Sequence, residues 1–129
     1  MTIKYFILLF SILLYLQSNA QFLEQETILP EFTNAVFPGG EKARVEFLKK
    51  NVVYAISAKE EGIQGKVYIN FTVDKVGNLK DFILKRGVHP LLDIEALRVM
   101  ETMPQFTPAT REGNPVSISY TTYVNFSLK

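Results

Sequence analysis

The fold is decided by the stretch Gly65-Lys66-Val67-Tyr68-Ile69-Asn70-Phe71-Thr72-Val73. Within it, apolar residues recur at every second position. A period of two is typical of a β-strand that has one face in a hydrophobic core and the other toward solvent. We therefore expect a half-buried strand here, and the side chains expected to point inward are Val67, Ile69, Phe71 and Val73.

A second strand is expected directly after the first. Residues 74–78 indicate a tight turn, because Gly77 is free to take a positive φ angle. Leu79–Arg86 then returns beside the first strand. The two strands form a predicted β-hairpin.

Two main helices are expected, one before and one after this hairpin in the sequence. From Glu41, apolar residues recur at helical spacing for about three turns, and a shorter helical piece over residues 55–61 ends at Gly62. The second main helix covers residues 92–103 and is ended by Pro104. The apolar positions of the first helix are Ala43, Phe47, Leu48 and Val52, and those of the second are Leu92, Ala96, Val99, Met100 and Met103.

The chain closes with a predicted strand over residues 116–128, which we expect to be its longest. It follows a Pro- and Gly-containing connection over residues 105–115. No charged residue occurs from Val116 to Leu128, although natural edge strands are commonly protected by Lys, Pro or bulges. This strand is therefore either central in its sheet or an edge that is used for binding.

The N-terminus predicts export. Residues 1–20 show a positive start at Lys4, an apolar run over residues 5–16 and a small residue, Ala20, before a cleavage site, which is the layout of a signal peptide. The run is shorter than the about 20 residues of a membrane-spanning helix. The alternative is an uncleaved anchor in the inner membrane that leaves the domain facing the periplasm. Residues 21–36 show neither a helical nor a strand period and predict a short arm, and residues 37–129 form the expected domain.

Composition excludes several classes of protein. With 47% hydrophobic residues, the 129-residue chain has enough apolar material for one core. After removal of residues 1–20, which contain Lys4, acidic and basic residues are equal in number. The domain therefore has no excess positive charge to attract nucleic acid or an anionic membrane. The absence of cysteine excludes disulfides, thiolate metal sites, a Cys nucleophile and a lipidated cysteine anchor.

No catalytic constellation is visible, so we expect no enzyme activity, no cofactor, no metal and no small-molecule substrate. His89 is the single histidine and precedes Pro90, where a capping role is the simpler explanation than a general base. Gly39-Gly40 indicates a turn and lacks the Lys-Ser/Thr ending of a phosphate loop. Glu60 and Glu61 are expected at a solvated helix end.

The order of these elements and the residues that form the turns resemble those of the C-terminal domain of TonB proteins. The similarity runs from about Phe37 to Phe126 and lies in seven segments that occur in the correct order. These are Phe37-Pro38-Gly39-Gly40; Asn51-Val52-Val53-Tyr54 with Ala58; Gly62-Ile63-Gln64-Gly65-Lys66-Val67; Phe71-Thr72-Val73-Asp74-Lys75 with Gly77; Glu95-Ala96-Leu97-Arg98-Val99; Met103-Pro104 with Phe106 and Pro108; and Gly113-Asn114-Pro115-Val116.

The resemblance implies an α+β fold, with a three-stranded antiparallel sheet and two main helices packed on one face. It also implies a periplasmic binding domain, similar to the part of energy transducers that engages outer-membrane receptors in TonB-dependent transport. In that family the C-terminal strand pairs with a short N-terminal segment of the receptor, the TonB box. By this resemblance, the partner-binding residues are Ser119, Tyr120, Thr121, Thr122, Tyr123, Val124 and Asn125.

A structural role is the alternative. Only about 16 residues separate Ala20 from Phe37, and at about 3.3 to 3.6 Å each they reach at most about 58 Å. This short arm favours an assembly module of the cell envelope, acting as a homodimer or as one subunit of a complex without energy transduction. In that case the C-terminal strand is buried or pairs with a second copy of the chain.

Overall fold

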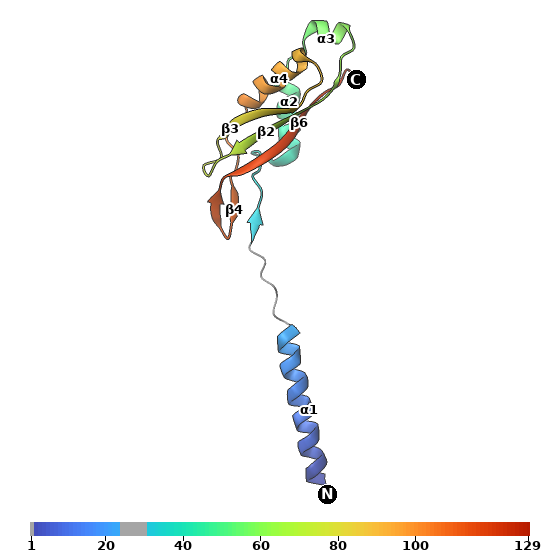
Figure 1. Ribbon diagram of the computed structural model, residues 1–129, viewed down its shortest axis with the longest axis vertical. Coiled ribbons are helices and arrows are strands. Elements are labelled where there is room, and N and C mark those ends of the chain that lie inside the picture. Colours follow the sequence, from blue (N-terminus) through green and yellow to red (C-terminus); the bar gives the residue numbers. More distant parts are fainter. Residues whose placement is uncertain (1, 24–30) are drawn as a thin grey trace.

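The computed structural model describes residues 2–23 and 31–129, and the side chains of residues 3–16 and 31–129. Helix α1 (Thr2–Leu23) stands apart from the remaining elements (Figure 1), and its side chains from Ile3 to Leu16 are exposed. Within the described parts of the chain, no helix combines the length and the apolar character needed to cross a membrane. Residues 24–30 of the expected arm lie outside the described residues, and cleavage after Ala20 stays a prediction.

The main sheet is antiparallel, with the strand order β3-β2-β6. Strands β2 (Gly65–Val73) and β3 (Leu79–Arg86) form the predicted hairpin with the expected bounds. The inward face is also confirmed, since the four side chains at alternate positions of β2 are completely buried: Val67, Ile69, Phe71 and Val73.

Both main helices cover the same face of this sheet, as expected (Figure 1). Helix α2 spans Gly40–Asn51, and α4 spans Pro90–Glu101. The short helix α3 (Ile56–Glu60) ends just before Gly62. The apolar stripe of α4 is buried against the sheet at Leu92, Ala96, Val99 and Met100, whereas Met103 lies beyond the helix and is half-buried. The α+β architecture is confirmed.

A second, smaller sheet was not predicted. It has the strand order β1-β4-β5, where β1 is Phe32–Thr33, β4 is Ala109–Arg111 and β5 is Asn114–Val116. The expectation of an arm without strand structure and of an irregular connection over residues 105–115 is therefore wrong at these positions. Strands of two or three residues are too short to show a period in the sequence.

The C-terminal strand also differs in detail from the prediction. Residues 116–128 divide into the end of β5 and strand β6 (Ile118–Phe126). At nine residues, β6 is as long as β2 rather than the longest strand. It occupies an edge of the main sheet, which resolves the choice between a central and an edge position.

A cluster of aromatic side chains joins the segments that follow β1 and precede β4 to the core under the main sheet. Phe71 of β2 packs edge-on against Phe106, with ring centroids 5.9 Å apart. Phe106 in turn contacts Phe37 at 5.6 Å, and Phe37 contacts Phe47 of α2 at the same distance. Gly77 lies so close to the carbonyl oxygen of Phe106 that a Cβ atom there would lie 1.8 Å from it, so the hairpin turn requires glycine.

We predict that Ile69→Ala lowers the free energy of unfolding by about 2–5 kcal/mol, because the substitution leaves a cavity at a fully buried position. Ile83→Ala on the adjacent strand β3 is the matched control. Ile83 is 51% exposed, and its truncation should change stability by less than about 0.5 kcal/mol. Urea denaturation followed by circular dichroism measures both values, and equal losses would contradict the assignment of faces.

Candidate functional site

The two edges of the main sheet are built differently. Strand β6 pairs with β2 over nine consecutive positions, from Gly65↔Phe126 to Val73↔Ile118, without a register shift. Among the described residues, no strand pairs with the other side of β6. Its backbone N–H and C=O groups on that side form a regular row, which is the usual template for an added strand.

Strand β3, at the opposite edge, carries protections that β6 lacks. Its pairing with β2 is interrupted by two register shifts, and Asp81 in this strand has a positive φ of 56°. Charged side chains accompany these irregularities at Lys80, Lys85 and Arg86. Bulges and charges of this kind prevent edge-to-edge pairing, so the sheet leaves one edge suited to accept a strand and blocks the other.

All seven residues predicted from the resemblance lie on β6, and their side chains alternate between its two faces. Thr122 and Val124 are buried toward the helices, and Tyr120 is half-buried on the same side, against Phe71. Four side chains are exposed on the outer face: Ser119, Thr121, Tyr123 and Asn125. The structure thus brings the seven together along one edge, while their binding role stays a prediction.

The outer face of the sheet is held by polar and aromatic contacts. Asn70 of β2 donates from its side-chain amide to the hydroxyl oxygens of Ser119 and Thr121, at 3.0 and 2.8 Å. The ring centroids of Tyr123 and Tyr68 lie 5.8 Å apart. The ammonium nitrogen of Lys66 lies 4.6 Å from the ring centroid of Tyr123. These contacts fix β6 to β2 without using its free edge.

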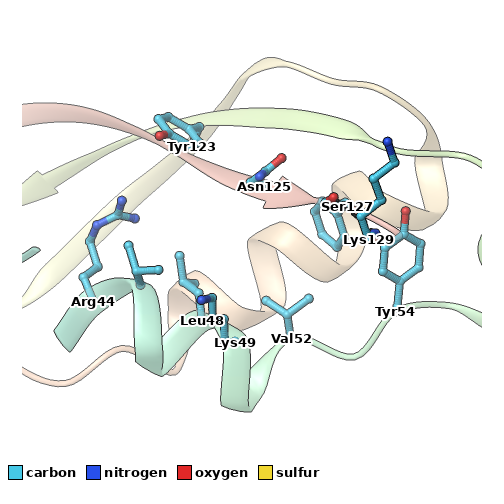
Figure 2. Close-up of a pocket in the computed structure, with 11 residues that line it drawn as sticks. Arg44, Leu48, Lys49, Val52, Tyr54, Tyr123, Asn125, Ser127 and Lys129 are labelled. Atoms are coloured by element: carbon cyan, nitrogen blue, oxygen red, sulfur yellow. Dashed lines mark hydrogen bonds between the residues drawn. The ribbon is translucent and has the colours of Figure 1, made fainter. Parts of the chain in front are cut away.

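A groove of about 500 Å³ runs between helix α2 and β6 (Figure 2). Apolar side chains of α2 and Phe126 line it together with polar groups from α2, β6 and the C-terminal residues. The lining residues are Arg44, Val45, Leu48, Lys49, Val52, Tyr54, Tyr123, Asn125, Phe126, Ser127 and Lys129. In Figure 2, Arg44 and Tyr123 stand at one end, and Tyr54 and Lys129 at the other. Because β6 forms one wall, a strand added to its edge would lie along the groove.

Arg44 is the charged residue buried most deeply in this groove, with only 5% of its surface exposed. Its Nε and one terminal nitrogen donate to the carboxylate of Glu41, at 2.8 and 2.5 Å. This pairing raises the pKa of Arg44 above its ordinary value and lowers that of Glu41. The other terminal nitrogen, Nη1, is buried and has no hydrogen-bond partner.

Sequence reasoning did not identify Arg44. Arg44 was not among the predicted core or site residues, yet it lies one turn before Leu48, and both are buried. Residues four apart lie on the same helix face. The available signal was therefore an arginine on the apolar stripe of an amphipathic helix.

An ion pair on α4 positions the end of the groove at which Tyr54 lies. Glu95, which is 9% exposed, accepts hydrogen bonds from the guanidinium of Arg98 and, at 2.7 Å, from the backbone N–H of Val53. Arg98 also donates to the carbonyl of Asn51 at 2.9 Å. Residues 51–53 are thereby held against α4, and they lead directly into Tyr54, whose hydroxyl donates to the carbonyl of Ile63.

The remaining candidates have structural roles. His89 precedes α4 as its N-cap, where Nδ1 accepts a 3.2 Å hydrogen bond from the N–H of Leu91. The capping interpretation is therefore confirmed. Gly39 and Gly40 form a turn in which the N–H of Gly40 donates to the carbonyl of Phe37 at 2.8 Å. Within residues 2–23 and 31–129, no three His, Cys, Asp or Glu side chains are grouped to hold a metal ion.

The family model described as Gram-negative bacterial TonB protein C-terminal matches residues 50–128. The chain therefore belongs to the TonB C-terminal family, as the sequence motifs indicated. No curated protein sequence matches it. The family match covers strands β2, β3 and β6 and helix α4, whereas Arg44 and Lys49 on α2 lie just before it.

Membership fixes the general class of function. Domains of this family are periplasmic and non-enzymatic, act in TonB-dependent transport, and interact with outer-membrane receptors. The family match favours this class over the assembly module considered from the sequence.

We predict that the Glu95 ion pair makes stability depend on pH. Its hydrogen bonds to Arg98 and Val53 lower the pKa of Glu95 below the ordinary value of 4.5. The ionised carboxylate therefore stabilises the fold fully above about pH 4.5, and this stabilisation is lost as the pH falls through the lowered pKa. Glu95→Gln should cost about 1.5–3 kcal/mol at pH 7 and flatten this acid-side decline.

Thermal unfolding monitored by circular dichroism from pH 7 to acid measures this effect. Glu101→Gln is the control, because Glu101 is exposed at the end of the same helix. A pH profile of Glu95→Gln identical to that of the unsubstituted protein would overturn the assignment.

Proposed function

We propose that this domain binds the TonB box of an outer-membrane receptor by adding it as a strand to the free edge of β6, at residues 119–125. The observation that carries the proposal is the contrast between the two edges of one sheet. Strand β6 is regular, uncharged and open, whereas β3 is bulged and charged. Backbone hydrogen bonds would supply affinity, and alternate side chains of the peptide would supply selectivity.

A second copy of the chain is the competing occupant of this edge. Two β6 strands pairing with each other would use the same backbone groups as the receptor peptide. A homodimer formed in this way is therefore incompatible with peptide binding at β6, and the concentration dependence of the oligomeric state separates the two.

We predict that peptides from the N-terminal segments of TonB-dependent receptors encoded in the same genome bind the domain. Tyr123→Pro removes one backbone N–H and places a ring in β6, so it should weaken binding at least about tenfold. Ile83→Pro makes the same change at the opposite edge, on β3, and should leave binding unchanged. Fluorescence anisotropy with labelled peptides measures the affinities, and circular dichroism verifies that each variant folds.

Peptide chemistry gives a test that leaves the protein unaltered. N-methylation of every second peptide residue blocks one edge of the added strand, and methylation of the intervening residues blocks the other edge. One of the two methylated peptides should lose binding and the other should keep it. Equal binding of both, or no binding by any receptor segment, would refute strand addition.

We further propose that the mature chain begins at Gln21 and is located in the periplasm. The basis is the layout of residues 1–20, with a short apolar run before Ala20. Intact-mass measurement on the protein from fractionated cells should give a start at Gln21 in the soluble periplasmic fraction. A start at Met1 in the inner-membrane fraction would instead show a retained anchor, and would support direct energy transduction by this chain.

A further inference from the structure

The outer face of the main sheet carries one large side chain beside the free edge of β6. Four side chains of β6 point to this face, and three of them are short: Ser119, Thr121 and Asn125. The fourth, Tyr123, is 38% exposed. Both main helices pack on the opposite face of the sheet (Figure 1), so the outer face is accessible to a ligand.

The ring contacts of Tyr123 come from a single neighbouring strand. The ring packs against that of Tyr68 and lies under the ammonium group of Lys66. Both neighbours belong to β2, and among the described residues no strand lies beyond β6. These contacts hold the Tyr123 ring from the β2 side and leave aromatic surface exposed beside the open edge.

The hydroxyl groups further along the outer face already have hydrogen-bond partners. The side-chain amide of Asn70 donates to the hydroxyl oxygens of Ser119 and Thr121, and the hydroxyl of Ser119 also lies 3.1 Å from Oδ1 of Asn70, to which it donates. Because these groups pair within the sheet, they require no polar group from a ligand. Tyr123 is therefore the outward side chain of β6 that offers apolar surface to an added strand.

The register shows what an added strand would place beside this ring. Tyr68 and Tyr123 are directly opposite each other in the pairing of β2 with β6. A strand added to the free edge would continue this row and bring one of its outward side chains next to Tyr123. Neighbouring side chains on one face of a sheet have Cβ atoms about 4.5–5.5 Å apart, a distance at which aromatic side chains make favourable contacts.

We propose that Tyr123 selects an aromatic residue in the bound peptide, whose ring packs on the exposed surface of Tyr123 and extends the row begun by Tyr68. This inference rests on the proposed strand addition at β6 and specifies one residue of its ligand. A short side chain at the same peptide position would leave the Tyr123 ring exposed to water. An aromatic residue should therefore bind about threefold to fivefold more tightly than Ala there, the effect of one favourable cross-strand pair.

The chain contains no tryptophan, so the fluorescence of a Trp in the peptide reports only the surroundings of that Trp. Starting from the receptor segment that binds most tightly, peptides carry Trp at each position in turn, each paired with an Ala peptide of otherwise identical sequence. We expect a position at which Trp binds about threefold to fivefold more tightly than Ala, with its emission shifted to shorter wavelength on binding. Ratios near one at every position would overturn the Tyr123 subsite and leave strand addition intact. Absence of binding by every segment would overturn both.

Variants of β6 assign this preference to Tyr123. Tyr123→Thr should bring the Trp/Ala affinity ratio at that position close to one and reduce the emission shift, whereas a general loss of structure would weaken both peptides alike.

The double variant Thr121→Tyr/Tyr123→Thr is the matched control, because it keeps the same composition and moves the ring two residues along the same face of β6. The preferred Trp position should move by two residues in the peptide. Both substituted positions are exposed, and circular dichroism verifies that each variant folds. A preference that persists in Tyr123→Thr, or that stays at the same peptide position in the double variant, would refute the proposal.

Discussion

The antiparallel pairing of β2 with β6 is the constraint on which the rest of the structure depends. It runs over nine positions without a bulge, and side chains alternate between faces at each step. A slip by one residue would expose Val124 and Phe126 and turn Tyr123 and Asn125 into the core. The same register therefore determines the packing of the core against α2 and α4, and places the free edge of β6 beside the groove.

The elements that the sequence predicted are those that carry a long repeating pattern. Strand β2 and helix α4 show periods of two and of 3.6 residues over many positions, and Gly77 marks the turn between β2 and β3. Strands β1 and β4 are too short to show such a pattern. They also pair residues far apart in the chain, such as Thr33 and Thr110. Their existence depends on tertiary contacts that no local window contains.

The candidate site was predictable only in part, for a related reason. The C-terminal strand could be located from its alternating pattern, but the sequence left open whether it was central or an edge, and the family resemblance gave its expected role. Arg44 was not located, since whether a helical arginine is solvated or buried depends on what packs over it. The backbone edge is a feature that any extended peptide can use, whereas the groove wall on α2 belongs to a part of the chain outside the family match.

Strand β1 has a mechanical consequence. The carbonyl of Glu31 accepts from the N–H of Glu112 at 2.8 Å, and Val36 exchanges two backbone hydrogen bonds with Thr107 at 3.0 and 2.8 Å. Tension applied to the chain ahead of residue 31 meets these bonds before it reaches the core. The hairpin that receives the load, β4 with β5, continues at Val116 directly into β6. The small sheet thereby links the segment that begins at residue 31 to the strand at the free edge of the main sheet.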